Sequence, residues 1–245
     1  MSMIRIDALS FDYGGGEGGV FQDLSLTLDT EWKLGLVGRN GRGKTTLLKL
    51  ISGELRPSGG EITAKADFRY FPYAVREDGT ALEACESAEP EYTFWKLCRE
   101  LTLLGLEADL LCRPWRTLSG GEKVKVMLAL LFAAEERFLL IDEPTDHLDA
   151  KGRALLGDYL AAKRGFLLVS HDREVLDRCT DHTLALNRTG AEIVRGNFSC
   201  WLREKQRRDE FESAENEKRK KEISRLETAA ARTAGWSAAL ERTKI

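Results

Sequence analysis

The first thirty residues alternate apolar and polar side chains on both sides of a glycine-rich segment. The stretches IRIDALSFDY and VFQDLSLTLD share this period of two, and GGGEGG separates them. Such alternation is typical of strands with one buried face, and a glycine turn between two of them favours antiparallel pairing. The pattern therefore predicts an antiparallel β subdomain in this part of the chain.

Further along, continuous apolar strands alternate with helical patterns. The strands are WKLGLVG, RFLLIDEP and FLLVSHD, and residues 54–72 have the pattern of further strands with a turn at PSGG. The segment HTLALNRTGAEIVRG has the pattern of a hairpin. Buried strands that alternate with helices favour a parallel sheet covered on both faces. We expect an α/β fold, with a mixed sheet flanked by helices beside the antiparallel subdomain.

Residues 74–117 interrupt this alternation. Their most regular stretch, EPEYTFWKLCRELTLLGLE, is amphipathic at helical spacing and predicts a short helical subdomain. The longest apolar run, VMLALLFAA, is too short to span a bilayer and predicts a core helix. The start MSMIRIDALSFDY lacks the pattern of a secretion signal. We therefore expect a cytoplasmic protein without direct membrane insertion.

Composition changes this picture little. The chain has 245 residues, 42% of them hydrophobic, which suffices for one large domain or two small ones. A net charge of −3 argues against a nucleic-acid binder that relies on overall positive charge. The five cysteines show no CxxC pair, as expected for thiols in a reducing compartment.

A phosphate-binding loop follows the strand WKLGLVG. Residues 38–45 read GRNGRGKT, which fits G-x4-G-K-[ST] between a strand and a helix. Backbone N–H groups and the helix start attract phosphate, Lys44 reaches the β- and γ-phosphates, and Thr45 binds Mg²⁺. The predicted cofactors are ATP and Mg²⁺. The predicted nucleotide-binding residues here are Gly38, Asn40, Gly41, Gly43, Lys44, Thr45 and Thr46.

Two acidic residues end the strand FLLI, where ligand sites of such sheets lie. Asp142 is predicted to hold Mg²⁺, largely through its water shell, and Glu143 to orient the attacking water or accept its proton. His171 follows the next buried strand. From spacing alone it is either a structural hydrogen-bonding residue or a contact to the γ-phosphate.

A second anion-binding helix start is predicted at LSGGE, residues 118–122. It offers Ser119, Gly120 and Gly121 immediately before a helix. One phosphate tail does not need two such cradles from one domain. We therefore expect this segment to close over a nucleotide that another domain holds.

Together these motifs resemble an ATP-binding cassette (ABC) ATPase over about residues 1–200. The set is the phosphate-binding loop, LSGGE, LLIDEPTDHLD at residues 139–149 and SHD at 170–172. The resemblance implies two cassettes arranged head to tail around two ATP molecules. It further implies that Ser119 and Gly121 face the partner's γ-phosphate, that Asp149 crosses the interface, that His171 is the switch histidine and that Tyr13 stacks on adenine.

The chain departs from that family at one position. Cassettes usually carry a glutamine after the strand that leads into the helical subdomain, whereas FRYFPY places Tyr73 there. A phenol can hydrogen-bond a water molecule but is a poorer Mg²⁺ ligand than an amide carbonyl. The glutamine's role is therefore not carried over to Tyr73.

The segment 201–245 is highly charged and includes FESAENEKRKKEISRLE. Pairs such as Glu217 and Lys221 stand four apart and support a helix, which is polar all round and is either a solvated terminal helix or a bridge between domains. DEPTDHLD, GNFSCWLREKQR and this segment resemble the ABC-F group. WKLGLVGRNGRGKTT, RPWRTLSGGEKVKV and AARTAGWSAALERTKI most resemble its Lsa and Vga branch, linked to antibiotic resistance by ribosome protection.

The ABC-F resemblance implies that residues 201–245 are a charged helical linker, which we expect to be truncated here. The second cassette would then lie downstream in the native chain, or a second copy would serve as a homodimer partner. The implied partners are the ribosome and tRNA, and the implied activity is Mg²⁺-dependent ATP hydrolysis that needs both cassettes. Two alternatives stay open: the ATPase subunit of an ABC membrane transporter, and a DNA-maintenance ATPase of the SMC kind.

Overall fold

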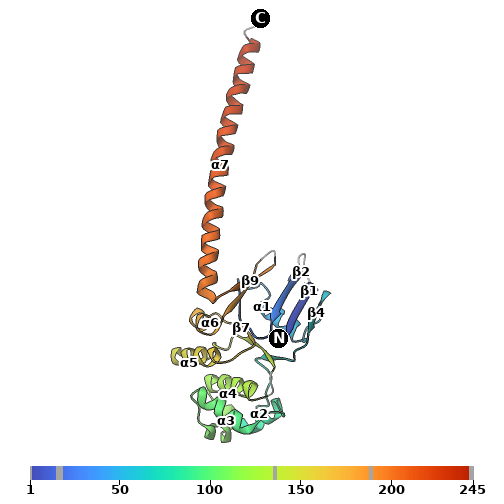
Figure 1. Ribbon diagram of the computed structural model, residues 1–245, viewed down its shortest axis with the longest axis vertical. Helices are drawn as coiled ribbons and strands as arrows, with labels where there is room; N and C mark the ends of the chain where they lie inside the picture. The colour runs from blue at the N-terminus through green and yellow to red at the C-terminus, as the bar shows by residue number, and fades with distance from the viewer. Residues whose placement is uncertain (1, 15–18, 135–136, 188–189, 243–245) are drawn as a thin grey trace. The chain divides into compact units, whose positions relative to one another are not determined.

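The computed structural model describes residues 2–14, 19–134, 137–187 and 190–242. The chain divides into two compact units, Met1–Trp201 and Leu202–Ile245. The first unit contains both sheets and the six shorter α-helices (Figure 1). The second consists of most of one long helix.

The antiparallel sheet is built from the alternating stretches at the start of the chain. It contains β1 (Met3–Phe11), β2 (Phe21–Asp29) and β4 (Gly59–Ala64) in the order β2-β1-β4. Ile4 pairs with Leu28 on one side and with Ala64 on the other. The predicted antiparallel pairing of the first two stretches is confirmed, and β4 is its third strand.

The larger sheet has six strands in the order β5-β6-β7-β3-β8-β9. Its first five strands run parallel, and β9 runs antiparallel to β8, so the predicted mixed sheet is confirmed. The strands are β3 (Lys33–Gly38), β5 (Phe68–Phe71), β6 (Phe138–Asp142), β7 (Phe166–Val169), β8 (His182–Leu186) and β9 (Ala191–Arg195).

The prediction for residues 54–72 is only partly right. Strands occur there, but β4 belongs to the antiparallel sheet and β5 to the edge of the larger one. The glycines of PSGG lie inside β4 instead of forming the turn. At Gly60 φ is +75°, and a Cβ would come within 2.3 Å of the Ala8 carbonyl oxygen. The close approach of β1 therefore requires glycine at this point of the strand.

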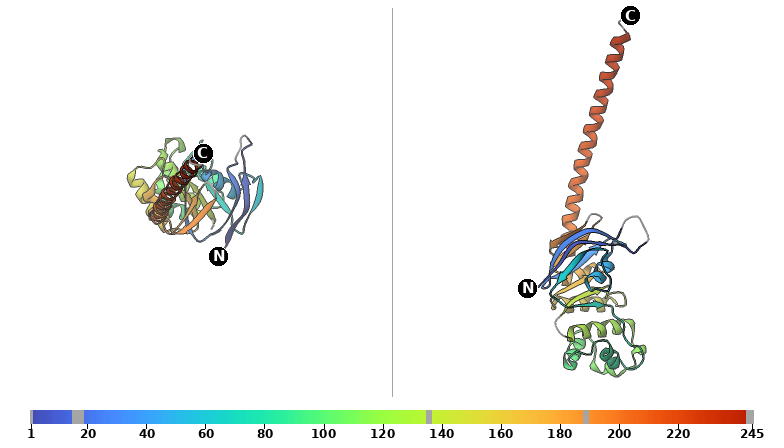
Figure 2. Two further views of the ribbon diagram at one scale, coloured as in Figure 1. Left: turned by 90° about the horizontal axis from the view of Figure 1, so that it is seen from above. Right: turned by 90° about the vertical axis from the view of Figure 1, so that its right-hand side faces the viewer.

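Helices cover the larger sheet and form a cluster at one end of this unit. The helices that follow strands are α1 (Lys44–Ile51), α5 (Ala150–Ala161) and α6 (Arg173–Cys179). Figure 1 and the right view of Figure 2 show α2 (Ala81–Ala88), α3 (Phe94–Leu103) and α4 (Gly120–Ala133) gathered away from the antiparallel sheet. Two 3₁₀ turns, Ala108–Cys112 and Trp115–Thr117, connect α3 to α4.

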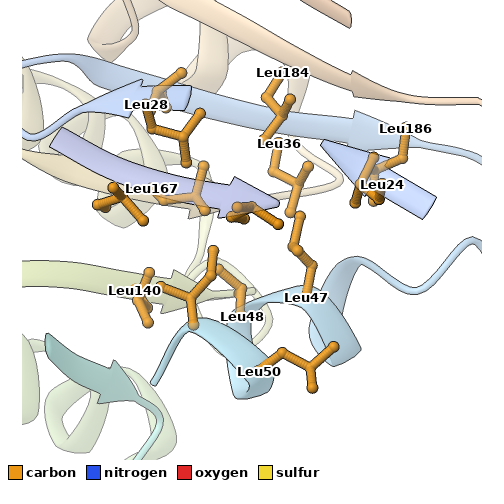
Figure 3. Packing of buried hydrophobic residues seen from close by; sticks show 14 of the residues in the cluster. Leu24, Leu28, Leu36, Leu47, Leu48, Leu50, Leu140, Leu167, Leu184 and Leu186 are labelled. Carbon is orange, nitrogen blue, oxygen red and sulfur yellow. The ribbon is translucent and has the colours of Figure 1, made fainter. Parts of the chain in front are cut away.

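The main hydrophobic core surrounds α1 between the two sheets. Figure 3 shows Leu47 and Leu48 of α1 among leucines of both sheets, including Leu28 of β2 and Leu167 of β7. On the opposite face of the larger sheet α6 packs against Gly35, where a Cβ would meet Leu176 at 3.3 Å. The core therefore fixes β3 and the start of α1, between which the phosphate-binding loop lies.

The long helix α7 (Phe198–Arg242) begins inside the first unit. Its first turn is held by Asp177 of α6, whose Oδ1 accepts the Ser199 N–H at 2.6 Å. Trp201 is buried, whereas every side chain from Gln206 to Lys221 is exposed. Within the described residues, no helix combines the length and apolar character needed to cross a membrane.

Candidate functional site

The carboxyl ends of three parallel strands meet at one cavity. The phosphate-binding loop follows β3, Glu143 follows β6 and His171 lies shortly after β7, and these strands are neighbours in the sheet. The cavity measures about 410 Å³. It is lined by Tyr13, Val20, Asn40, Gly41, Gly43, Lys44, Thr45, Thr46, Asp142, Glu143, Val169 and His171. The fold thus brings together residues from four separate stretches of sequence.

The loop's last glycine shapes the start of α1. Gly43 is the residue before the helix and has φ +84°. A Cβ on Gly43 would lie 2.5 Å from Val20 Cγ1 and 2.8 Å from Phe21 Cζ. No side chain of the described chain caps this helix end. Its backbone N–H groups and the helix dipole therefore remain suited to an anion in the cavity.

Lys44 lies along the loop. Its Nζ donates to the Gly38 carbonyl oxygen at 3.0 Å and approaches Asn40 Oδ1 at 3.5 Å. Gly38 is thus placed beside the cavity as an acceptor for Lys44. An ammonium group carries three donors, so one remains for a phosphate oxygen.

Tyr13 stands at the edge of the same cavity. Its hydroxyl and Thr46 Oγ1 are 3.0 Å apart, and its ring packs edge-on against Phe11 with centroids 4.8 Å apart. The Tyr13 side chain is nevertheless 65% exposed. One end of the ring is therefore held in place while a large part of its surface stays accessible to a flat ligand.

The two carboxylate oxygens of Asp142 differ in their surroundings. Oδ2 accepts a 3.0 Å hydrogen bond from the Tyr70 hydroxyl, while Oδ1 is buried and has no hydrogen-bond partner among the described residues. Burial and the charge of Asp142 raise the pKa of Tyr70, so the phenol keeps its proton and remains the donor. A buried carboxylate oxygen without a partner among the described residues, in a cavity that Thr45 also lines, fits the oxygen ligands that Mg²⁺ prefers.

Glu143 is held in an uncommon conformation. Its φ is +47°, and such a left-handed backbone at a non-glycine residue costs about 1–3 kcal/mol. Its N–H donates to the Val169 carbonyl oxygen at 2.9 Å, and its Oε2 accepts the His171 N–H at 2.9 Å. His171 Nε2 lies 3.2 Å from Oε1, in a geometry that does not meet hydrogen-bond criteria. Main-chain bonds thus fix the carboxylate beside His171.

Burial of Glu143 favours its protonated form. Burial raises the pKa of this carboxyl, and the charges of Asp146 and Asp142 act in the same direction. The hydrogen bond from the His171 backbone and the electrostatic interaction with His171 oppose them without reversing the direction. A carboxylate with a raised pKa is a stronger base than an ordinary glutamate.

LSGGE lies outside this cavity and starts α4. Ser119 and Glu122 form a capping box, in which Ser119 N–H donates to Glu122 Oε2 at 2.7 Å and Glu122 N–H donates to Ser119 Oγ at 3.2 Å. Ser119 is exposed and its own hydroxyl proton remains available to another acceptor.

The loop after β6 packs against this helix start. A Cβ on Gly120 would lie 3.1 Å from His147 Cβ, and one on Gly121 would lie 3.0 Å from the His147 carbonyl oxygen. Asp149, two residues further, caps α5 by accepting the Gly152 N–H at 2.7 Å. The fold therefore packs both glycines of LSGGE against the loop that ends at Asp149, and none of Ser119, Gly120, Gly121 and Asp149 lines the cavity that contains Lys44.

The surroundings of the two tyrosines near β5 did not follow from the sequence. The Tyr73 hydroxyl donates to the Met127 carbonyl oxygen of α4 at 2.9 Å, and Tyr73 is absent from the described residues that line the cavity. Tyr70, which was not predicted as a site residue, contacts Asp142 instead. Its position could have been found only from the pairing of β5 with β6.

Comparison with known proteins identifies relatives of this chain. A family model described as ABC transporter matches residues 21–146. The chain is 34% identical over 73% of its length to ABC transporter F family member 3 of Arabidopsis thaliana, of which it covers 26%. It is 32% identical over 89% of its length to the ribosome protection protein VmlR of Bacillus subtilis, of which it covers 38%.

A shorter relative is covered over most of its length. The zinc import ATP-binding protein ZnuC of Hydrogenovibrio crunogenus is 32% identical over 74% of this chain and 78% of its own. A bacterial Atm1-family ABC exporter solved with ATP bound has the same fold, with a TM-score of 0.69 at 18% identity over 82% of this chain and 40% of the exporter chain. The chain spans about a third of the length of the first curated relatives it matches.

Proposed function

The chain belongs to the ABC transporter family of ATP-binding cassettes, and on this basis we propose that it binds ATP with Mg²⁺ and hydrolyses it together with a second cassette. The observation that carries the proposal is the shared cavity of Lys44, Asp142, Glu143 and His171. It joins a phosphate-binding helix start to carboxylates suited to a cation and a water molecule.

Each residue of the cavity has a proposed role. The loop N–H groups and Lys44 bind the β- and γ-phosphates, Tyr13 stacks on the adenine, and Thr45 and Asp142 hold Mg²⁺. When bound, Mg²⁺ would offset the negative charge of the phosphates.

The proton transfer falls to Glu143. With its raised pKa it accepts a proton from the attacking water, a step that contributes about 10²–10⁴-fold to such reactions. His171 keeps the carboxylate in place through its backbone N–H and offers its exposed imidazole to the γ-phosphate.

A second cassette is proposed because the predicted nucleotide-binding residues of LSGGE, together with Asp149, do not line the cavity. Ser119, Gly120, Gly121 and Asp149 belong to two packed segments outside the cavity, so we assign them to a nucleotide held by a partner cassette. The partner's equivalent residues would cover the ATP bound here. In isolation the chain is expected to bind nucleotide with little turnover.

We further assign the chain to the ABC-F group, as a cytoplasmic protein that acts on the ribosome and tRNA. Residues 1–200 form the cassette, with its helical subdomain at about 74–117, and residues 201–245 form a charged linker. Two of the relatives support this assignment: one is named an F family member and the other a ribosome protection protein. The Lsa/Vga branch and a role in antibiotic resistance remain the most specific part of the proposal.

A transporter ATPase subunit is the second candidate. The similarity to ZnuC over 78% of that protein favours it. The long polar helix argues for the first candidate, because every side chain from Gln206 to Lys221 is exposed and none belongs to the buried core of the cassette.

The test uses the full-length product of the gene that encodes this chain, carrying Glu143→Gln. ATP-dependent pelleting with ribosomes is expected, because the substitution retains ATP and keeps the two cassettes closed. The matched control adds Lys44→Ala, which removes nucleotide binding and should abolish pelleting. If the Glu143→Gln protein binds ATP but stays in the supernatant, the ribosomal role is wrong and the transporter candidate gains.

A further inference from the structure

Tyr70 lies one strand away from β6, near the carboxyl end of β5. Its hydroxyl donates to Asp142 Oδ2 at 3.0 Å, although Tyr70 is not among the residues that line the cavity. In the parallel register Tyr70 pairs with Leu140, and Asp142 follows two residues later. Because side chains alternate along a strand, Tyr70 and Asp142 project from the same face.

Because of this contact, the two oxygens of the Asp142 carboxylate have different roles. Asp142 is only 8% exposed, its Oδ2 is taken by Tyr70, and its Oδ1 is buried without a partner among the described residues. A carboxylate held at one oxygen cannot rotate freely. Its second oxygen is therefore presented in a fixed direction, as is common for metal ligands whose other atoms are hydrogen-bonded by neighbours.

We infer that Tyr70 is a positioning residue for the nucleotide's Mg²⁺, acting through the Asp142 carboxylate. The inference rests on the proposed function, because it requires ATP with Mg²⁺ to be the ligand of the cavity. Tyr73, by contrast, donates to the Met127 carbonyl oxygen of α4 and does not line the cavity, so Tyr70 is the tyrosine of this segment that contacts Asp142.

The experiment measures how strongly Mg²⁺ and nucleotide help each other to bind. The 245-residue chain is titrated with a fluorescent non-hydrolysable ATP analogue, once in excess EDTA and once in saturating Mg²⁺. The ratio of the two Kd values is the coupling between metal and nucleotide. Tyr70→Phe keeps the ring and removes only the hydroxyl, while Tyr73→Phe is the matched control at a tyrosine away from the cavity.

Tyr70→Phe is expected to leave the Kd in EDTA within about two-fold of wild type and to lower the coupling ratio about ten-fold, as for partners of metal ligands elsewhere. Asp142→Asn should remove most of the coupling, and Tyr73→Phe should leave it unchanged. A merely structural role for Tyr70 would weaken binding equally in both conditions and keep the ratio constant.

Two results would overturn the inference, and they differ. If wild type gains no nucleotide affinity from Mg²⁺, both the proposed function and the role of Tyr70 fall. If wild type and Asp142→Asn behave as expected but Tyr70→Phe keeps the wild-type ratio, only the role of Tyr70 falls. Thermal unfolding of each variant shows that the comparison is made between folded chains.

Discussion

Glu143 shows how much a single residue is constrained by the chain around it. Its left-handed backbone, the bond from its N–H to Val169 and the bond that it accepts from His171 all act on one side chain. These restraints hold the carboxylate in a partly buried position, and this burial raises its pKa. Position and basicity therefore have one structural origin.

The raised pKa of Glu143 predicts the pH dependence of turnover. Only the carboxylate accepts a proton, so ATP hydrolysis by the full-length protein should fall as the pH drops through a value above that of an ordinary glutamate. Glu143→Gln should retain ATP and lose about 10²–10⁴-fold in turnover, without this dependence. Steady-state phosphate release across pH measures both. Unchanged turnover in Glu143→Gln would refute the role.

At the residue scale, the residues of contiguous motifs can be predicted from the sequence. The phosphate-binding loop is contiguous, so Lys44 and Thr45 can be read from spacing and flanking elements. Tyr70 could not be predicted, because its contact with Asp142 joins residues 72 positions apart. Such a contact depends on the register between two strands, which no local pattern contains.

Among the elements, α3 is tied to the rest of its unit by a buried charge. Glu100 of α3 accepts hydrogen bonds from the Tyr159 hydroxyl of α5 at 2.7 Å and from Lys163 Nζ at 2.5 Å. Lys163 also lies over the rings of Phe132 and Tyr159, at 4.9 and 4.6 Å from their centroids. This cluster joins α3, α4 and α5.

Lys163→Met is therefore expected to destabilise the chain by about 3–5 kcal/mol, because it leaves the Glu100 carboxylate buried without its cation. The Glu100 side chain is 8% exposed and the Lys163 side chain 17%, so solvent screens their interaction little. Adding Glu100→Gln should restore a large part of the loss, since the amide oxygen still accepts from Tyr159. Urea unfolding of both variants measures this, and equal loss in single and double variants would contradict it.

The periodicity of apolar residues predicted the helices and strands more reliably than it predicted the contacts between them. The stretch around α3 was predicted to be helical. The helix itself begins at Phe94, and Thr93 before it has an extended conformation. That the same helix buries Glu100 was not predictable, since a charged residue in an amphipathic pattern is read as exposed. Its partners lie about 60 residues further along the chain.

The whole first unit ends at a well-defined point. Trp201 is 8% exposed, and the α7 start is held by Asp177 through Ser199. The Asn197 side-chain amide also donates to the Asp177 carbonyl oxygen at 3.2 Å. The first turn of the long helix is therefore part of the folded cassette.

Two shortened chains test this boundary. A chain that ends at Leu202 should keep the free energy of unfolding of the 245-residue chain within about 0.5 kcal/mol, the usual range for changes at exposed positions, because the side chains from Gln206 to Lys221 are exposed. A chain that ends at Gly196 should lose about 3 kcal/mol or more, because it removes a buried tryptophan and the residues that hold it. Chemical denaturation compares them, and equal stability would show that the boundary lies before residue 197.

At this scale the sequence predicted the fold class but not the strand order. Buried strands and helices alternate visibly along the chain, which favours a parallel sheet. That β3 lies between β7 and β8, and that β4 pairs with β1 on the side away from β2, follows from contacts between distant segments.

The strand order also determines when the cavity can form during synthesis of the chain. A chain is synthesised from its amino end, so β3 and its phosphate-binding loop emerge long before the strands on either side of them. Leu36 pairs with Val169 of β7 and with Leu184 of β8. Asp142 and Glu143 also emerge about a hundred residues after the loop. The nascent chain can therefore hold nucleotide in the finished cavity only after about residue 186, when nearly the whole cassette has been made.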